Sequence, residues 1–399
     1  MSLELSQTCQ KIAPSATFAM DAKAKALRAA GESVIGFAAG EPDFDTPLPI
    51  RDAMKEALDL GQTRYSPVPG TLEIRDAIIA KLQRDNGLAY ARDEVIVSNG
   101  AKHTLYTIFQ TILNDGDEVL IPTPCWVSYP EMVRMAGGVP VFVEAGESEG
   151  FVPSAAQIAA AVTAKTKAFM LTSPSNPNGC VWSREALQAL AALAVEKDFY
   201  IVSDEIYEKL IYDGVEHISV ASFGEAAKAH TLVVNGVSKT YAMTGFRIGY
   251  AAGPKAVISA MNNYQSQASS APNTPAQHAA ALAMTMPQDC VEEMRVAFES
   301  RRNQIVEGIN AIPGLSCLKP QGAFYVMMNI QTLIGKKCDG EVITGSASFA
   351  ELLLTKAHVA VVPGDAFMAE GFCRLSYAIS SEMIAEGLRR IAAFVKELK

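Results

Sequence analysis

Short apolar segments alternate with amphipathic segments through the middle of the chain, from residue 95 to residue 252. The amphipathic segments carry apolar residues three and four positions apart, as one face of a helix requires. The clearest of them are 101–113 and 184–197. The apolar segments have the length and composition of buried strands. The predicted strands are 95–98, 118–121, 139–143, 167–171, 200–204, 231–235 and 248–252.

This alternation indicates an α/β fold with a mostly parallel seven-stranded sheet that helices cover on both faces. In such sheets the ligand binds beyond the carboxyl ends of the strands. We therefore expect the functional site where polar clusters follow the predicted strands, at residues 98–100, 174–177, 204–205 and 238–239.

The C-terminal third has a different pattern and predicts a smaller α+β domain. A helix is expected from Asp289, followed by short strands at 323–329, 359–362 and 373–377 and a last helix that ends at Lys399. Thr274, followed by Pro275, is predicted to cap a further helix near the domain junction. We predict a large domain over residues 46–288, and a small domain formed by residues 1–45 together with 289–399.

Composition narrows the class of protein. The chain has 399 residues and a formal net charge of −9, without a block of consecutive basic residues, which argues against a nucleic-acid partner. Residues 256–288 carry no formal charge but contain Asn, Gln and Pro, so we expect a buried or interface segment and no membrane partner. Seven scattered cysteines without a C-x-x-C pair, and an N-terminus without a signal peptide, indicate a cytoplasmic protein with reduced thiols.

Lys239 ends an apolar strand, and Arg247 follows eight residues later. A lysine amine that is desolvated beside other cations has a lowered pKa and can form a Schiff base. Arg247 suits a bidentate contact to a phosphate, and Gly100 opens a helix whose free N–H groups could bind the same phosphate. Taken alone, a glycine at this position more often marks an ordinary strand-to-helix turn.

Asp204 also ends a strand, where a carboxylate can keep a pyridine nitrogen protonated; alternatively it caps a helix. If a helical turn follows, the side chains of Tyr207 and Asp204 lie on the same face of it. The hydroxyl of Tyr207, like the amide of Asn176, could donate a hydrogen bond to a phenolate oxygen. Asn176 lies in a strong turn sequence, so a turn residue is the alternative.

Trp126 follows a strand and could stack on an aromatic ring, although a core position is the alternative. Arg374 lies in an apolar segment, where an unpaired guanidinium is costly, so either a substrate carboxylate or a structural ion pair is expected to meet it.

The order of these motifs along nearly the whole chain resembles the fold-type I pyridoxal-phosphate enzymes, specifically the class I aminotransferases. The segment 124–133 (P-C-W-V-S-Y-P-E-M-V) is particularly similar to the bacterial aspartate aminotransferase branch. The other motifs are G-E-P-D-F at 40–44, R-Y-S-P-V-P-G at 64–70, S-N-P-N-G at 175–179, S-D-E-I-Y at 203–207, S-K-T at 238–240, G-F-R-I-G-Y at 245–250 and R-L-S-Y-A at 374–378.

The resemblance implies pyridoxal 5′-phosphate as cofactor, with Lys239 as the catalytic residue that forms the Schiff base and then transfers protons. It implies a homodimer with shared active sites, because Tyr65 would reach the phosphate in the neighbouring subunit. Many relatives have Ser or Thr where this chain has Gly236, which leaves one phosphate contact open. The implied cofactor-binding residues are Tyr65, Gly100, Ala101, Lys102, Trp126, Asn176, Asp204, Tyr207, Ser238, Lys239 and Arg247. The implied substrate-binding residues are Ser15, Thr17, Gly40, Lys102, Trp126, Asn176 and Arg374.

The predicted activity is ping-pong transfer of an amino group between an L-amino acid, aspartate by first preference, and 2-oxoglutarate. Prephenate, aromatic or alanine aminotransferases and a carbon–sulfur lyase on the same fold remain alternatives. The sequence lacks G-x-G-x-x-G after a strand and H-x-x-x-H, which disfavours a nicotinamide dehydrogenase and a metal enzyme. Fewer than 50 residues precede the core, which disfavours a transcriptional regulator.

Overall fold

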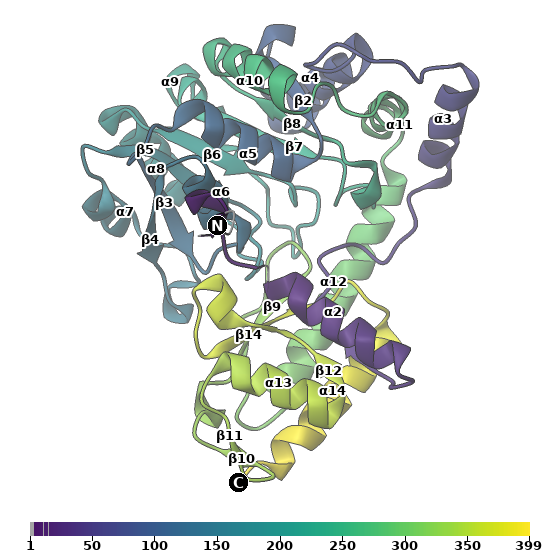
Figure 1. The fold of residues 1–399 in the computed structure, drawn as a ribbon, viewed down its shortest axis with the longest axis vertical. Helices are drawn as coiled ribbons and strands as arrows, with labels where there is room; N and C mark the ends of the chain where they lie inside the picture. The colour runs from purple at the N-terminus through teal and green to yellow at the C-terminus, as the bar shows by residue number, and fades with distance from the viewer. Residues whose placement is uncertain (1–3, 11, 15) are drawn as a thin grey trace.

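The computed structural model describes residues 4–10, 12–14 and 16–399 (Figure 1). Its main feature is a seven-stranded sheet in the order β2-β8-β7-β6-β5-β3-β4, with only β8 antiparallel to its neighbours. The predicted α/β class and all seven predicted strands are confirmed. The strands are β2 (Val95–Ser98), β3 (Glu118–Thr123), β4 (Val139–Glu144), β5 (Thr166–Thr172), β6 (Tyr200–Asp204), β7 (Thr231–Gly236) and β8 (Gly249–Ala252).

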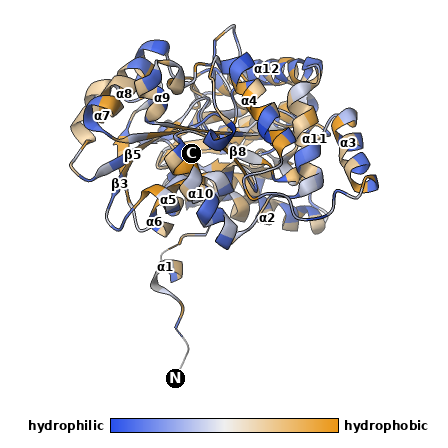
Figure 2. Ribbon diagram, turned by 90° about the horizontal axis from the view of Figure 1, so that it is seen from above, coloured by the Kyte–Doolittle hydropathy of each residue, from blue (hydrophilic) through white to orange (hydrophobic). Residues whose placement is uncertain are grey.

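Helices cover both faces of this sheet because successive strand residues point to opposite faces (Figure 2). In β6, Val202 packs in one core cluster with α5 (Ala101–Ile112), α6 (Ser128–Met135) and α10 (Lys255–Ala268). The neighbouring Ile201 packs in another cluster on the opposite face. The helices on that face are α4 (Leu72–Asn86), α7 (Ala155–Ala161), α8 (Arg184–Lys197), α9 (Glu225–Ala229) and α11 (Thr274–Thr285), and α3 (Leu48–Asp59) packs on α11.

The remaining elements share a separate core that draws on both ends of the chain. A three-stranded antiparallel sheet has the order β13-β14-β9, and β1 (Ile35–Gly36) pairs with β12 in parallel. The predicted strand at 359–362 is divided in two, β12 (Val359–Ala360) and β13 (Val362–Pro363). The other elements of this core are α2 (Ala16–Ala29), α12 (Asp289–Asn310), β9 (Tyr325–Asn329), β10 (Lys337–Cys338), β11 (Glu341–Val342), α13 (Ser346–Ala357), β14 (Phe372–Ser376) and α14 (Ser381–Glu397). The exception is the short helix α1 (Gln7–Gln10), which lies apart from the body of the protein (Figure 2).

The two kinds of core meet within α12, which runs from one to the other (Figure 1). Val291 packs with the helices of the large sheet, whereas Met294, one turn later, packs in the core shared by both chain ends. This change of partner supports the predicted boundary near residue 289, which stays a prediction.

One local expectation is revised. Helix α11 is capped by Asn273, whose side-chain oxygen accepts the N–H of Ala276 at 2.9 Å, whereas the hydroxyl of Thr274 donates to the carbonyl of Arg64. Strands β10 and β11 form an antiparallel hairpin. Among the described residues, no helix combines the length and apolar character needed to span a membrane.

Candidate active site

The site lies at one edge of the large sheet, where five strands end. Strands β3, β5, β6 and β7 are parallel, and β2 has the same direction because β8 is antiparallel to both β2 and β7. Their carboxyl ends therefore meet at a single edge, as the sequence predicts. The residues that follow them are Gly100 after β2, Trp126 after β3, Asn176 after β5, Asp204 at the end of β6 and Lys239 after β7.

Lys239 is partly buried, and its amine donates a hydrogen bond to the carbonyl of Gly40 at 2.6 Å. Burial lowers the pKa of Lys239 to about 8, with further lowering by the charges of Arg247 and Arg374 against the opposing charge of Glu41. A substantial fraction of this amine is therefore unprotonated near neutral pH and can act as a nucleophile or a base. Gly40, a predicted substrate residue, lies directly beside it.

Asp204 is fully buried, and burial raises its pKa to about 6. Two donors oppose this effect: the Tyr129 hydroxyl donates to Oδ2 at 2.8 Å and the backbone N–H of Ile206 donates to Oδ1 at 3.2 Å. The alternative of a helix cap is not observed, because turns and no helix follow β6. Tyr129 was not among the predicted site residues, although it lies three residues after Trp126 in the segment that carried the resemblance.

Tyr207 and Asn176 lie close to strands β9 and β14, where they contact Tyr325 and Arg374. The Tyr207 hydroxyl hydrogen-bonds the Tyr325 hydroxyl at 3.0 Å, and the Oδ1 of Asn176 accepts from Nη1 of Arg374 at 3.0 Å. Tyr325 is a second residue that the sequence prediction missed, because nothing in its local sequence distinguishes it from a core tyrosine.

Arg374 comes from β14 and is buried, yet it makes no salt bridge to a described carboxylate. Its Nη2 donates to the carbonyl of Ala38 at 2.9 Å, and its guanidinium lies 4.5 Å from the ring centre of Tyr325. Its Nε is buried without a partner among the described residues. The structural ion pair weighed for Arg374 is therefore not observed, and an anionic ligand would complete its contacts.

Gly100 lies in the turn before α5, and the side chain of Arg247 packs against it. Gly100 has φ +85° and a Cβ at this position would lie 2.2 Å from Nη2 of Arg247, so only glycine fits. Arg247 donates to the carbonyls of Thr244 at 2.9 Å and Asn99 at 3.3 Å. The helix begins at Ala101 without a side-chain cap, which leaves the N–H groups of its first turn for a ligand.

Lys102 follows in the same turn, with its amine 4.7 Å from the ring centre of Trp126 and 5.9 Å from that of Phe18. Burial, and then the charge of Arg247, lower the pKa of Lys102. Trp126 is partly buried and packs edge-on against Tyr129, with ring centres 5.2 Å apart. Thr17 lies on α2, one residue before Phe18, and its hydroxyl is buried. Ser15, which was predicted with it, lies outside the described residues.

Two further predicted residues have different surroundings. Ser238 is buried beside Lys239. Tyr65 is 96% exposed, and lies with Leu58 and Asn273 along an open hollow of about 840 Å³. No contact of Tyr65 with the residues at the strand ends is seen within the described part of this chain, so a role of Tyr65 in a site would need a second subunit.

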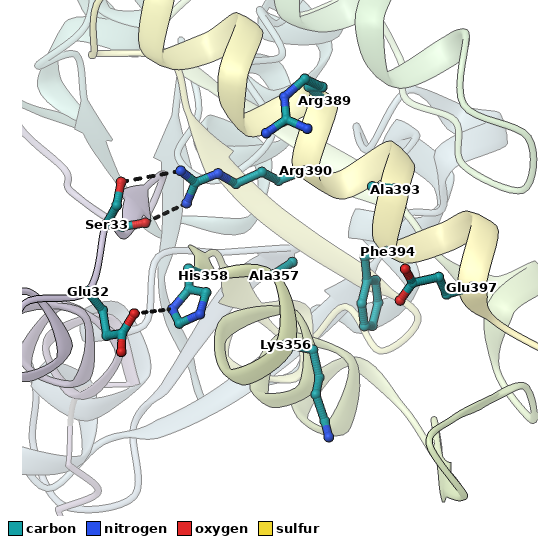
Figure 3. A pocket seen from close by; sticks show the side chains of 10 residues that line it. All are labelled: Glu32, Ser33, Lys356, Ala357, His358, Arg389, Arg390, Ala393, Phe394 and Glu397. Atoms are coloured by element: carbon teal, nitrogen blue, oxygen red, sulfur yellow. Dashed lines mark hydrogen bonds and ion pairs between the residues drawn. The ribbon is translucent and has the colours of Figure 1, made fainter.

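A second hollow, of about 390 Å³, lies between the start of β1, the end of α13 and α14 (Figure 3). Several of its charged side chains already have partners, since Arg390 donates to the carbonyl of Ser33 and Glu32 lies 3.8 Å from the ring of His358. None of the predicted site residues lines it.

The residues at the strand ends fit pyridoxal phosphate. The uncapped start of α5, with Arg247 beside it, has the donors that a phosphate needs. Asp204 is a buried carboxylate without a bonded cation among the described residues, as a protonated pyridine nitrogen requires. Lys239 has the lowered pKa expected of an amine that bonds a carbonyl carbon.

Comparison with known proteins agrees with this geometry. The pattern of the family described as aminotransferase class I and II matches residues 32–391. The chain is 50% identical to an aspartate aminotransferase of Bacillus sp. (strain YM-2), over 98% of this chain and 99% of the relative. It is 48% identical to an aspartate/prephenate aminotransferase of Thermus thermophilus, over 97% of this chain and 98% of the relative.

The fold agrees as well. The crystal structure of the aspartate aminotransferase from Rhizobium meliloti superimposes with a TM-score of 0.97, at 41% identity and with full coverage of both chains. Enzymes of this family are pyridoxal-phosphate-dependent, which confirms the predicted cofactor. With half of its residues identical to a relative over nearly the full length and a matching fold, the chain belongs to the aminotransferase class I and II family.

Proposed function

We propose that the protein transfers the amino group of L-aspartate to 2-oxoglutarate in two half-reactions at this site. The observation that carries the proposal is the presence of two separate cations around Trp126 and Asn176: Arg374, which bonds Asn176, and Lys102, whose amine faces Trp126. A dicarboxylic substrate needs one cation for each carboxylate. The relatives named as aspartate aminotransferases support the same substrate.

Arg374 would bind the carboxylate next to the reacting carbon, since its Nε is buried without a partner in the described part of the chain and Asn176 fixes its orientation. Gly40 and Trp126 would border the same carboxylate. Lys102 would bind the distal carboxylate, with Thr17 and Ser15 supplied by the N-terminal segment. The position of Thr17 next to Phe18, whose ring lies near Lys102, supports this arrangement.

The cofactor would be held at four points by residues of this chain. Asp204 would pair with its ring nitrogen, and Tyr207 and Asn176 with its phenolic oxygen. Ala101, Lys102, Gly100, Ser238 and Arg247 would surround its phosphate, and Trp126 would stack on its ring. Bound pyridoxal phosphate supplies an electron sink for breaking the Cα–H bond of the amino acid.

Lys239 would hold the cofactor covalently and, once released by substrate, move a proton to and from the substrate carbon. Its pKa of about 8 is close to the working pH, which suits a group that must both accept and return a proton. Glu41 and Asp204 favour the charged form, whereas Arg247 and Arg374 favour the neutral form. Substrate anions at Arg374 would shift this balance toward the charged amine.

We further propose a homodimer in which Tyr65 of one subunit completes the site of the other. Tyr65 is 96% exposed and lines the same hollow as Leu58, which is 51% exposed, and an exposed apolar surface of this kind would be covered by a second subunit. The adjacent hollow of about 840 Å³ between residues 58–66 and 271–275 offers room for a second copy. We also place the protein in the cytoplasm, which is consistent with seven unpaired cysteines.

Prephenate, a 2-oxo acid, is the second candidate substrate and would accept the amino group, because one 48% identical relative is named for aspartate and prephenate. Steady-state kinetics with L-aspartate, L-phenylalanine and L-arogenate, the amino acid that corresponds to prephenate, separate the possibilities. We expect Lys102→Met to reduce kcat/KM for aspartate by about 100-fold while changing that for phenylalanine by less than about threefold. Equal losses for both donors would show that Lys102 does not bind the distal carboxylate.

A further inference from the structure

The residue before the phosphate turn, Asn99, is held through both of its backbone polar groups. Its N–H donates to Nδ1 of His103 at 3.2 Å, and its carbonyl accepts from Nη2 of Arg247 at 3.3 Å. Asn99 follows β2 directly and precedes Gly100, the residue before the first turn of α5. The position of Asn99 therefore determines where the first N–H groups of α5 point.

His103 is oriented for this contact by its other neighbours. Its Nε2 lies 3.4 Å from the hydroxyl of Ser269, and its ring stacks on Tyr106 with centres 6.5 Å apart and planes at 19°. Because Nδ1 accepts the N–H of Asn99, the proton of the neutral ring belongs on Nε2, where Ser269 can accept it.

We propose that neutral His103 is a positioning residue for the cofactor phosphate, acting through Asn99 to hold the Asn99–Gly100 turn in its binding shape. The inference rests on the proposed cofactor site. An imidazolium at this position would place a proton on Nδ1, facing the N–H of Asn99, so protonation removes the only acceptor that the described residues offer to this N–H.

The surroundings of His103 favour the neutral form. Burial lowers the pKa of His103, and the charge of Arg247 lowers it further. The other cation on the same helix turn is Lys102, and the neighbouring hydroxyls are those of Tyr106, Tyr264 and Ser269. No carboxylate among the described residues contributes to this pKa. A phosphate dianion would act in the opposite direction and favour the imidazolium, which gives the proposal a clear competitor.

Two substitutions separate these roles. His103→Asn keeps an acceptor at the position of Nδ1 but cannot titrate, and His103→Leu removes the acceptor at similar size. Tyr106→Phe is the matched control, because it removes a hydroxyl on the same helix that bonds Tyr264 and not the turn. The measurement is the Kd of pyridoxal phosphate, titrated into protein freed of cofactor and followed by cofactor absorbance, from about pH 6 to about pH 8.

At about pH 8 we expect His103→Leu to bind the cofactor roughly tenfold more weakly than wild type, since the partly buried N–H of Asn99 loses its acceptor. His103→Asn and Tyr106→Phe are expected to stay within about threefold. As the pH falls, wild type is expected to lose affinity relative to His103→Asn. If His103→Leu does not fold, the pH dependence of cofactor affinity in wild type, compared with that in His103→Asn, tests the proposal by itself.

Unchanged affinity in a folded His103→Leu variant would overturn the proposal. A wild-type protein that gains affinity relative to His103→Asn at acidic pH would also overturn it, because His103 would then act as a cation toward the phosphate. Wild-type protein that binds no pyridoxal phosphate at any pH would instead refute the cofactor site itself.

Discussion

The hydroxyl of Tyr129 donates a hydrogen bond of 2.8 Å to the buried carboxylate of Asp204, and Thr172 donates to the same hydroxyl at 2.8 Å. This short chain of donors runs from β5 to the end of β6 through α6. It orients one carboxylate oxygen and stabilises its negative charge, whereas burial alone favours the protonated carboxyl. Among the groups that favour the anionic form of Asp204, Tyr129 therefore has the largest effect, followed by the N–H of Ile206.

Asp204→Asn is expected to stabilise the protein freed of cofactor. The pKa of Asp204 is about 6 in the folded protein, above its ordinary 3.8, so ionisation favours the unfolded chain. The favourable contribution of the protonated carboxyl is complete below about pH 4 and is lost as the pH rises through about 6. The free energy of unfolding of Asp204→Asn, measured by urea unfolding, should exceed that of wild type by about 2–3 kcal/mol at pH 8. The difference at pH 4 should be small.

Tyr129→Phe tests the same relationship in the opposite direction. Loss of the hydroxyl donor is expected to raise the pKa of Asp204 further. Asp204→Asn should therefore increase the free energy of unfolding more in the Tyr129→Phe protein than in wild type. Equal gains in both backgrounds, in a double-mutant cycle at pH 8, would show that Tyr129 does not stabilise the charge.

Arg374→Ala is expected to reduce kcat/KM for every amino donor by about 100-fold to 1,000-fold, because all of them carry the carboxylate that Arg374 would bind. Arg374→Lys keeps the charge but not the paired N–H groups and should recover only part of the loss. Cofactor affinity, measured in parallel, is expected to change by less than about threefold. A loss confined to dicarboxylic donors would contradict this role and assign Arg374 to the distal carboxylate.

The buried pair of Lys81 and Glu208 predicts a purely structural effect. Burial opposes ionisation of Glu208, but the charge of Lys81, together with weaker contributions from its hydrogen bond and from neighbouring basic groups, outweighs this effect and lowers the pKa of Glu208 to about 2. Glu208 therefore contributes stability above its ordinary pKa of 4.5, and this contribution falls as the pH drops toward 2. Lys81→Met should cost about 3–5 kcal/mol in urea unfolding at pH 7.

The exposed pair of Lys55 and Asp52 provides the control for this comparison, since both side chains are more than half exposed. Lys55→Met is expected to change the unfolding free energy by less than about 1 kcal/mol. Similar losses at both positions would contradict the claim that burial makes the Lys81–Glu208 pair important.

The sequence predicted the large sheet well because its strands are buried on both faces and read as continuous apolar segments. Where a strand ends, the next polar residue must lie at the sheet edge, so Asp204 and Lys239 could be assigned from the chain alone. The division of 359–362 into two strands could not be predicted, because those residues are uniformly apolar while their pairing partners, β1 and β14, come from distant segments.

The residues that support the site were harder to find. Tyr129 and Tyr325 lie at apolar helix and strand positions, where a tyrosine normally packs in the core, and only the fold brings their hydroxyls to Asp204 and Tyr207. The same holds for His103, whose contact with Asn99 depends on how β2 turns into α5. The expected roles of Tyr65 and Ser15 stay predictions, one needing a second subunit and the other lying outside the described residues.

The central claim is that Lys239 would bond pyridoxal phosphate in this site, and that the bound cofactor would accept the amino group of aspartate. The most direct test is the near-ultraviolet and visible absorbance spectrum of the purified protein with added pyridoxal phosphate, recorded before and after L-aspartate, beside Lys239→Ala. We expect a protein-bound cofactor band that aspartate converts to a pyridoxamine-like spectrum in wild type, and no such conversion in the variant. A wild-type spectrum identical to that of free cofactor, or full conversion by Lys239→Ala, would contradict the account.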